Sequence, residues 1–317
     1  MRLPVFLLGA VLFTSCAAQG YPARPVRIIV PLAAAGTGDT LARVVGEEMS
    51  KILGQPFLVE NRPGSGGVIG TEAVARSAPD GYTLVSASPS HVIHAALRPR
   101  IGYDPIKDFE PITVIAFTHQ LIVGHPSVPA SSVKELVAYA KKNPGKLNYG
   151  SAGTGSATHL NMELFKSMTG TFITHIPYKG STQSRQDLLA GEVQLSVDGL
   201  LPTLPLIRAG KLKAFGLTSS RRSSIAPEIP TLAEAGVTGY ASDTWYGMAA
   251  PAGTPKEIIA TLHAAAIKAI NTPSVHERLT AQGAELVGSS PAEFKSLLER
   301  ELLLWSKVVK DSGAKVD

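Results

Sequence analysis

The sequence predicts an α/β fold of two lobes, each a mostly parallel sheet flanked by helices, with a ligand cleft between the lobes. Apolar runs typical of buried strands alternate along the chain with stretches of helical apolar spacing, and this order favours parallel sheets with crossovers. The length of 317 residues exceeds a single domain of roughly 100–200 residues. A strand followed by a glycine-rich loop and a helix occurs twice, once in each predicted lobe.

Residues 1–20 have the pattern of a signal peptide. Arg2 gives a positive start, residues 3–13 form an apolar run, and small residues lead to an expected cleavage after Gly20. The run is too short for a membrane span, which needs about 20 apolar residues. The single cysteine, Cys16, lies in this segment, and a lipid anchor at Cys16 is the alternative to its removal. Without it, the mature chain has no thiol for catalysis or disulfides.

The first lobe is expected to begin with the strand Val26–Val30 and a helix over residues 39–53. A short strand over residues 57–59 follows. The glycine-rich stretch 61–70 resembles a dinucleotide fingerprint imperfectly, and we interpret it as a tight loop before a helix over residues 70–76. The turn 79–81 then introduces a strand over residues 82–86.

The second lobe is expected from about residue 123, and the two C-terminal helices are expected to return to the first lobe. No flexible linker separates the lobes, so strands should cross between them, at residues 112–123 and 245–250. The predicted division is residues 21–122 with 243–317 for lobe 1 and residues 123–242 for lobe 2. The remaining expected elements are helices over 132–141, 160–168, 256–270 and 291–310, and strands over 147–149, 193–197 and 212–217.

Charge and motif content exclude several classes of function. The formal net charge is +5, without a long Lys/Arg block, so we expect no nucleic-acid partner. His91 and His94 have no nearby pair of acidic residues, and the chain has no HExxH motif, so no metal site is expected. It also has no Gly-x-Ser-x-Gly elbow. We expect no cofactor.

The two glycine-rich loops, residues 35–39 and 152–156, are the main candidates for a binding site. Each follows an expected strand and opens an expected helix, with Asp39 and Ser156 as suitable N-cap residues. Free N–H groups at such a terminus attract anions, and glycine lets a ligand approach the backbone. Two such termini across a cleft would hold a carboxylate without an arginine. The alternative is a pair of ordinary helix caps.

Two further candidates remain open. Asp198 ends the strand over residues 193–197, where α/β sheets bind ligands, but it could equally cap the next helix. Ser156 and His159 lie one turn apart and could form a hydrolytic pair, although a capping serine beside a partly exposed histidine is the simpler interpretation.

The sequence resembles the substrate-binding proteins of tripartite tricarboxylate transporters, often called the Bug family. The matching segments run through nearly the whole mature chain in the family's order: residues 21–31, 39–43, 60–64 with Gly66 and Gly67, 79–84, 149–156 with His159, 177–180, 209–212, 230–236 and 250–255. The resemblance implies a two-lobed periplasmic binding fold of type II-like form that closes around a small organic acid. It also implies export to the periplasm, delivery to the subunits of a membrane permease, and no chemistry by this chain. We expect a monomer.

The resemblance also implies the ligand-binding residues. They lie in the first loop, after the third strand, in the second loop and at the end of a second-lobe strand: Ala33, Ala34, Ala35, Gly36, Thr37, Asp39, Ser88, Ser151, Ala152, Thr154, Gly155, Ser156, His159 and Asp198. The first loop departs from the family because Ala35 stands where relatives usually have glycine. Its Cβ could narrow the pocket or prevent a positive φ. The alternatives to a transport receptor are an exported hydrolase that uses Ser156 and His159, and a ligand sensor for a signalling partner.

Overall fold

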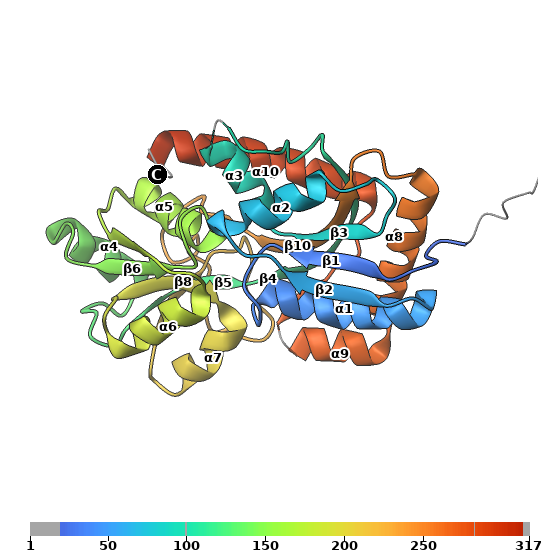
Figure 1. Ribbon diagram of the computed structural model, residues 1–317. Coiled ribbons are helices and arrows are strands. Elements are labelled where there is room, and N and C mark those ends of the chain that lie inside the picture. The colour runs from blue at the N-terminus through green and yellow to red at the C-terminus, as the bar shows by residue number, and fades with distance from the viewer. Residues whose placement is uncertain (1–19, 99, 282, 313–317) are drawn as a thin grey trace, which may run out of the picture.

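The computed structural model describes residues 20–98, 100–281 and 283–312 and has two lobes (Figure 1). Residues 1–19 of the predicted signal peptide lie outside the described residues. One sheet has the order β11-β4-β10-β3-β1-β2 and the other the order β7-β6-β8-β5-β9. The strands of the first sheet are β1 (Val26–Val30), β2 (Phe57–Asn61), β3 (Thr83–Ala87), β4 (Phe109–Thr118), β10 (Thr244–Pro251) and β11 (Ala284–Leu286). Those of the second are β5 (Gln120–Gly124), β6 (Asn148–Ser151), β7 (Thr174–Pro177), β8 (Leu195–Gly199) and β9 (Lys213–Leu217).

Helices cover both faces of each sheet. On one face of the first sheet, α1 (Thr37–Leu53), α8 (Lys256–Asn271) and α9 (Pro273–Ala281) bury their apolar sides. The opposite face carries α2 (Val68–Ala75), α3 (Ser90–Leu97) and α10 (Pro291–Ser312), with the short helix η1 (Ser65–Gly67) before α2. The second sheet lies between α4 (Val133–Lys142) and α5 (Ala157–Thr169) on one side and α6 (Ser181–Ala190) and α7 (Leu200–Arg208) on the other.

The α/β class and its helical layers are confirmed, but the sheets are mixed rather than mostly parallel. The pairs β1–β2, β1–β3, β6–β7 and β6–β8 are parallel. The pairs made by β4, β5 and β10 are antiparallel. These three strands adjoin the passages between the lobes, so the chain enters each sheet there from the opposite end.

The chain passes between the sheets at two closely spaced points. On the first passage only His119 separates β4 from β5, within the predicted segment 112–123. The second passage lies just before the predicted segment 245–250, because Ser242 still bonds to Thr218 of the second lobe and β10 lies entirely in the first sheet. The lobe boundaries proposed from the sequence remain a prediction about which parts move together.

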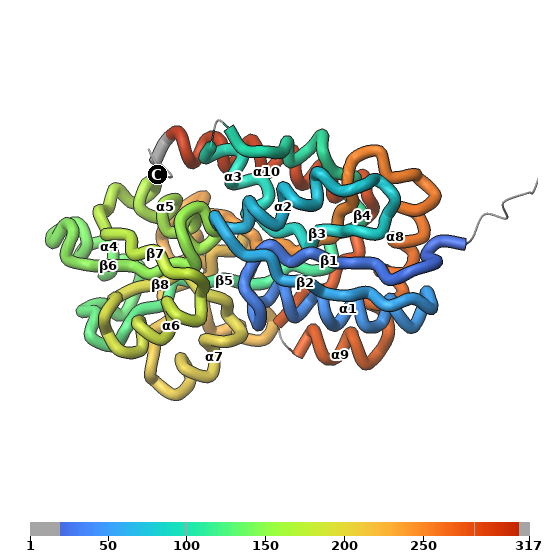
Figure 2. The backbone as a smooth tube through the Cα atoms, viewed as in Figure 1, coloured from blue at the N-terminus to red at the C-terminus, as the bar shows by residue number. Residues whose placement is uncertain are grey.

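The last helix also joins the lobes. α10 runs along one side of the molecule and packs against α3 of the first lobe and α5 of the second (Figures 1 and 2). Leu160 of α5 shares a buried cluster with Trp305 and Val308 of α10. None of the helices in the described part of the chain has the length and apolar character of a membrane span.

Candidate ligand-binding site

A cavity of about 530 Å³ lies between the lobes. The first lobe contributes residues 32–39 of the β1–α1 loop, together with Tyr246 and Gly283. The second contributes Ala152, residues 179–183 with Arg185, and residues 198–202, and the passage between the lobes contributes residues 118–120. A hollow of about 540 Å³ at the far end of β1 is lined by one lobe only, and its arginines, Arg24 and Arg27, already lie in ion pairs. The interlobe cavity is therefore the candidate site.

The first predicted loop lies on the wall of this cavity. Ala33, Ala34, Ala35 and Gly36 all lie on its wall, followed by the first turn of α1. Gly36 is the N-cap, and no side chain caps the helix. The N–H groups of the first turn have no acceptor within the helix, so they are available to a ligand.

Asp39 is not the N-cap that the sequence suggested, because α1 begins two residues earlier, at Thr37. The Asp39 carboxylate turns back and accepts the Ala35 N–H at 2.9 Å. It also accepts bonds from Arg43 Nε at 3.0 Å and Asn61 Nδ2 at 2.9 Å. Burial raises the pKa of this carboxyl, but Arg43 and the other donors outweigh burial and hold the pKa below its usual range. Asp39 thus shapes the loop as a carboxylate whose charge is paired with that of Arg43.

Ala35 adopts the left-handed conformation, with φ of 62°. Its Cβ therefore does not prevent a positive φ at the position where relatives usually have glycine. The left-handed conformation costs a non-glycine residue roughly 1–2 kcal/mol. The bond from the Ala35 N–H to Asp39 keeps the loop in this strained form.

The second predicted loop is placed differently. Only Ala152 of this loop lines the cavity. Ser156 caps α5 by accepting the His159 N–H at 3.3 Å, and His159 Nδ1 accepts the Gly155 N–H at 3.1 Å. Thr154 and Gly155 lie against the first lobe: a Cβ on Gly155 would be 2.4 Å from His94 Cε1, and the Thr154 carbonyl adjoins Gly66. The loop is an interlobe contact whose donors are largely used.

Beneath this loop, His159 stacks on the ring of His175, and Ser151 bonds to the same His175 ring. Ser151 Oγ is 2.6 Å from His175 Nε2, and the His159 and His175 rings stack at 4.1 Å. Burial lowers the pKa of His159 to about 4 and that of His175 to about 3. Ser156 Oγ meets the backbone N–H of His159 rather than its ring, and both side chains are buried, so this geometry forms no hydrolytic pair. Ser88 lines a separate hollow of about 10 Å³.

Sequence reasoning missed the wall formed by the start of α6. Lys179 and residues 180–183 line the cavity, Gly180 is the N-cap, and no side chain caps this helix. The glycine before Ser181 was the available signal. α7 also begins at the cavity, but its first turn offers less, since the Leu200 N–H bonds to the His119 carbonyl and Pro202 has no N–H. Two uncapped helix N-termini, of α1 and α6, thus open on one cavity from opposite lobes.

Asp198 lines the cavity, and its carboxylate forms an ion pair with Arg185. Arg185 Nε donates to Asp198 Oδ2 at 2.6 Å and Nη2 to Oδ1 at 3.0 Å. The Gly199 N–H also bonds to Asp198, at 2.7 Å. Burial raises the pKa of Asp198, although Arg185 opposes this effect. The sequence left open whether Asp198 contacts a ligand or caps a helix. The structure adds a third role, an ion pair with Arg185, a residue that the sequence analysis did not name.

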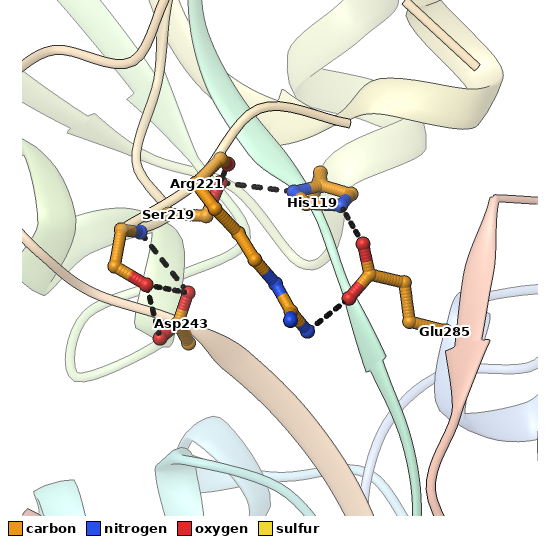
Figure 3. A network of polar contacts seen from close by, with 6 residues as sticks. His119, Ser219, Arg221, Asp243 and Glu285 are labelled. Carbon is orange, nitrogen blue, oxygen red and sulfur yellow. Dashed lines mark hydrogen bonds and ion pairs between the residues drawn. The ribbon is translucent and has the colours of Figure 1, made fainter. Parts of the chain in front are cut away.

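His119 lines the cavity and is bonded to residues of both lobes (Figure 3). Its Nδ1 is 2.9 Å from Ser219 Oγ of the second lobe, and its Nε2 is 2.9 Å from Glu285 Oε1 of β11. Arg221 also bonds to Glu285, and Ser220 bonds to Asp243 at the second passage. In the described ranges no group of His, Cys, Asp or Glu is arranged to hold a metal ion.

Comparisons with known proteins agree with this architecture. Residues 41–314 match the family model described as the tripartite tricarboxylate transporter family receptor. The chain is similar to Protein BugT of Bordetella pertussis, at 37% identity over 98% of this chain and 96% of that protein. It is also similar to a UPF0065 protein of Cupriavidus necator, at 40% identity over 83% of this chain and 79% of that protein.

Solved structures give the same result. A structure described as a periplasmic transporter superposes with a TM-score of 0.87 at 41% identity, covering 94% of this chain and all of that one. R. palustris Rpa4515, solved with adipate, has a TM-score of 0.87 at 38% identity, covering 93% of this chain and 100% of that chain. MatC of Rhodopseudomonas palustris, solved with bound malate, has a TM-score of 0.85 at 34% identity, covering 91% and 100%.

Proposed function

The chain belongs to the tripartite tricarboxylate transporter receptor family, the TctC or Bug proteins, and from that premise we propose that it captures a small organic carboxylate in the interlobe cavity. Members of this family are solute-binding receptors rather than enzymes. We further propose that residues 1–20 direct export to the periplasm and that the loaded monomer delivers its ligand to the permease subunits of a transporter.

The observation that carries this proposal is the pair of uncapped helix N-termini, of α1 and α6, on one cavity. Each terminus contributes roughly 0.3–1 kcal/mol toward an anion, and up to about 2 kcal/mol when partly buried. Micromolar binding needs about 8 kcal/mol, so several charge-assisted hydrogen bonds of roughly 1.5–3 kcal/mol must add to the dipoles. Relatives solved with adipate and with malate support a carboxylate as the ligand class.

The predicted site residues divide into two groups under this proposal. The ligand contacts would be those on the cavity wall: Ala33, Ala34, Ala35, Gly36, Thr37, Asp39, Ala152 and Asp198. The others, Ser88, Ser151, Thr154, Gly155, Ser156 and His159, would act through the shape of their loops and the contact between the lobes. Under this proposal, carboxylate capture depends more on the first loop than on the second.

Isothermal titration calorimetry tests the proposal directly. Natively purified protein, dialysed after mild unfolding and refolding to remove any retained ligand, is titrated with mono-, di- and tricarboxylates of two to six carbons. We expect saturable binding of at least one probe in the micromolar range or tighter. Absence of heat and of any thermal shift across the panel would sink the proposal, and turnover of ester probes that Ser156→Ala abolishes would point to a hydrolase instead.

A further inference from the structure

Building on the proposed function, we propose that Arg185 is a specificity-determining residue that makes the second-lobe wall of the cavity accept an anionic ligand end and reject an ammonium end. The observation that carries this inference is the Arg185–Asp198 pair on the cavity wall. The acid that could receive a ligand ammonium is already occupied by a residue of the protein itself.

The geometry of the pair leaves part of the guanidinium for a ligand. Arg185 lies on α6 and Asp198 near the end of β8. Arg185 uses Nε and Nη2 toward the carboxylate, at 2.6 and 3.0 Å, and its Nη1 has no hydrogen-bond partner among the described residues. The Asp198 side chain is 3% exposed and that of Arg185 is 18% exposed. The Arg185 side chain is therefore more accessible to a ligand than the Asp198 side chain.

The other charged groups of the cavity reinforce this selection. Asp39, the second acid on the wall, is held by Arg43, Asn61 and the Ala35 N–H. Lys179 lines the cavity and forms no ion pair with an acid in the ranges that the structure describes. His119 is bonded to Ser219 and Glu285. A ligand thus meets a positive side chain and two helix N-termini, while each acid on the wall is already paired.

The alternative is that Arg185 is only a structural partner of a buried acid. Removing one member of a buried pair leaves the other charge uncompensated, which destabilises a protein whatever the ligand. A structural role therefore predicts one common loss of affinity for every ligand. A specificity role predicts changes of opposite sign for ligands that differ only at the end that reaches the second lobe.

Three probes of equal length separate these roles: adipate, with two carboxylates; 6-aminohexanoate, with one ammonium; and hexanoate, with an apolar end. The C4 set of succinate, 4-aminobutanoate and butanoate covers a shorter span. In calorimetry on the wild-type protein we expect one dicarboxylate to bind at least 30-fold more tightly than its ω-amino analogue. Arg185→Met should weaken the dicarboxylate at least tenfold and strengthen the ω-amino acid, because Asp198 becomes available to the ammonium.

Matched variants guard against misfolding and general effects. Arg185→Lys should restore most of the dicarboxylate preference, and the double variant Arg185→Met/Asp198→Asn, which leaves no uncompensated charge, should lose the preference without gaining ω-amino binding. Arg208→Met, an exposed arginine on α7 outside the cavity lining, should match the wild type.

Equal wild-type affinity for the three ends, or a uniform loss in Arg185→Met, would overturn this inference while leaving carboxylate capture intact. Absence of binding by the wild type to any carboxylate would instead overturn the proposed function and this inference with it.

Discussion

Replacing Ala35 by glycine should stabilise the protein. Ala35 has φ of 62°, a conformation that costs an alanine roughly 1–2 kcal/mol and a glycine almost nothing. Glycine also gains freedom in the unfolded chain, which costs about 0.4–1 kcal/mol. Ala35 is exposed, so loss of its Cβ opens no cavity in the core. The net gain in the free energy of unfolding should be about 0.5–1 kcal/mol, or roughly 1–4 °C in Tm.

The neighbouring Ala34 provides the control for this prediction. It is also exposed and lies in the same loop, but its φ is not positive. Ala34→Gly should therefore lose about 0.4–1 kcal/mol, through the unfolded state alone. Urea unfolding of ligand-free protein, followed by circular dichroism, measures both. The two variants should differ by at least about 1 kcal/mol. If Ala35→Gly destabilises as much as Ala34→Gly, the conclusion that Ala35 is strained is wrong.

Two further predictions follow from the buried contacts. Gly155→Ala should weaken carboxylate binding at least tenfold in calorimetry, because the new Cβ would lie 2.4 Å from His94 Cε1 and hold the lobes apart. The control Gly54→Ala, also at positive φ but with nothing within 4 Å of the new Cβ, should leave the affinity unchanged. Equal affinities of the two variants would show that the interlobe contact has no part in binding. His91 is fully buried, and desolvation lowers its pKa from 6.5 to about 4. Burial of the neutral ring therefore contributes stability that is fully present above pH 6.5 and is lost as the pH falls from 6.5 to about 4. This loss reaches about 3 kcal/mol. Urea unfolding between pH 7.5 and 4.5 should show a smaller decline in the free energy of unfolding for His91→Gln than for the wild type. An identical decline in both proteins would assign the acid sensitivity to other groups.

Sequence patterns predicted the α/β class and most of the helices but not the direction of the strands. Apolar periodicity located β1 and the helices α1, α2, α4, α5, α8 and α10, because burial on a sheet face requires that spacing. It did not indicate α3, α6, α7 or α9. Strand composition does not encode the direction in which a strand enters a sheet. The antiparallel pairs of β4, β5 and β10 follow from the points at which the chain crosses between the lobes. The sequence indicated the positions of these crossings only approximately.

The candidate site shows the same division. A glycine-rich loop before a helix indicated the α1 terminus, although the helix begins at Thr37 rather than after Asp39. The same signal at Gly180 indicates the α6 terminus, which the sequence analysis did not name. Whether a terminus is free depends on the side-chain geometry of its cap: Ser156 turns onto α5, whereas nothing caps α1 or α6. Arg185 could not be predicted as the partner of Asp198, because the pairing depends on how α6 is rotated on the sheet.

The proposed function places a carboxylate between the lobes, at the uncapped terminus of α1. A crystal structure of the protein with the tightest-binding carboxylate of the calorimetry panel would show where the ligand is held. We predict one carboxylate in the interlobe cavity, within hydrogen-bond distance of the Thr37 and Gly38 amides, with its other end toward Arg185. A carboxylate held instead at the Ser156 terminus of α5, or in the hollow beside Arg24, would contradict it.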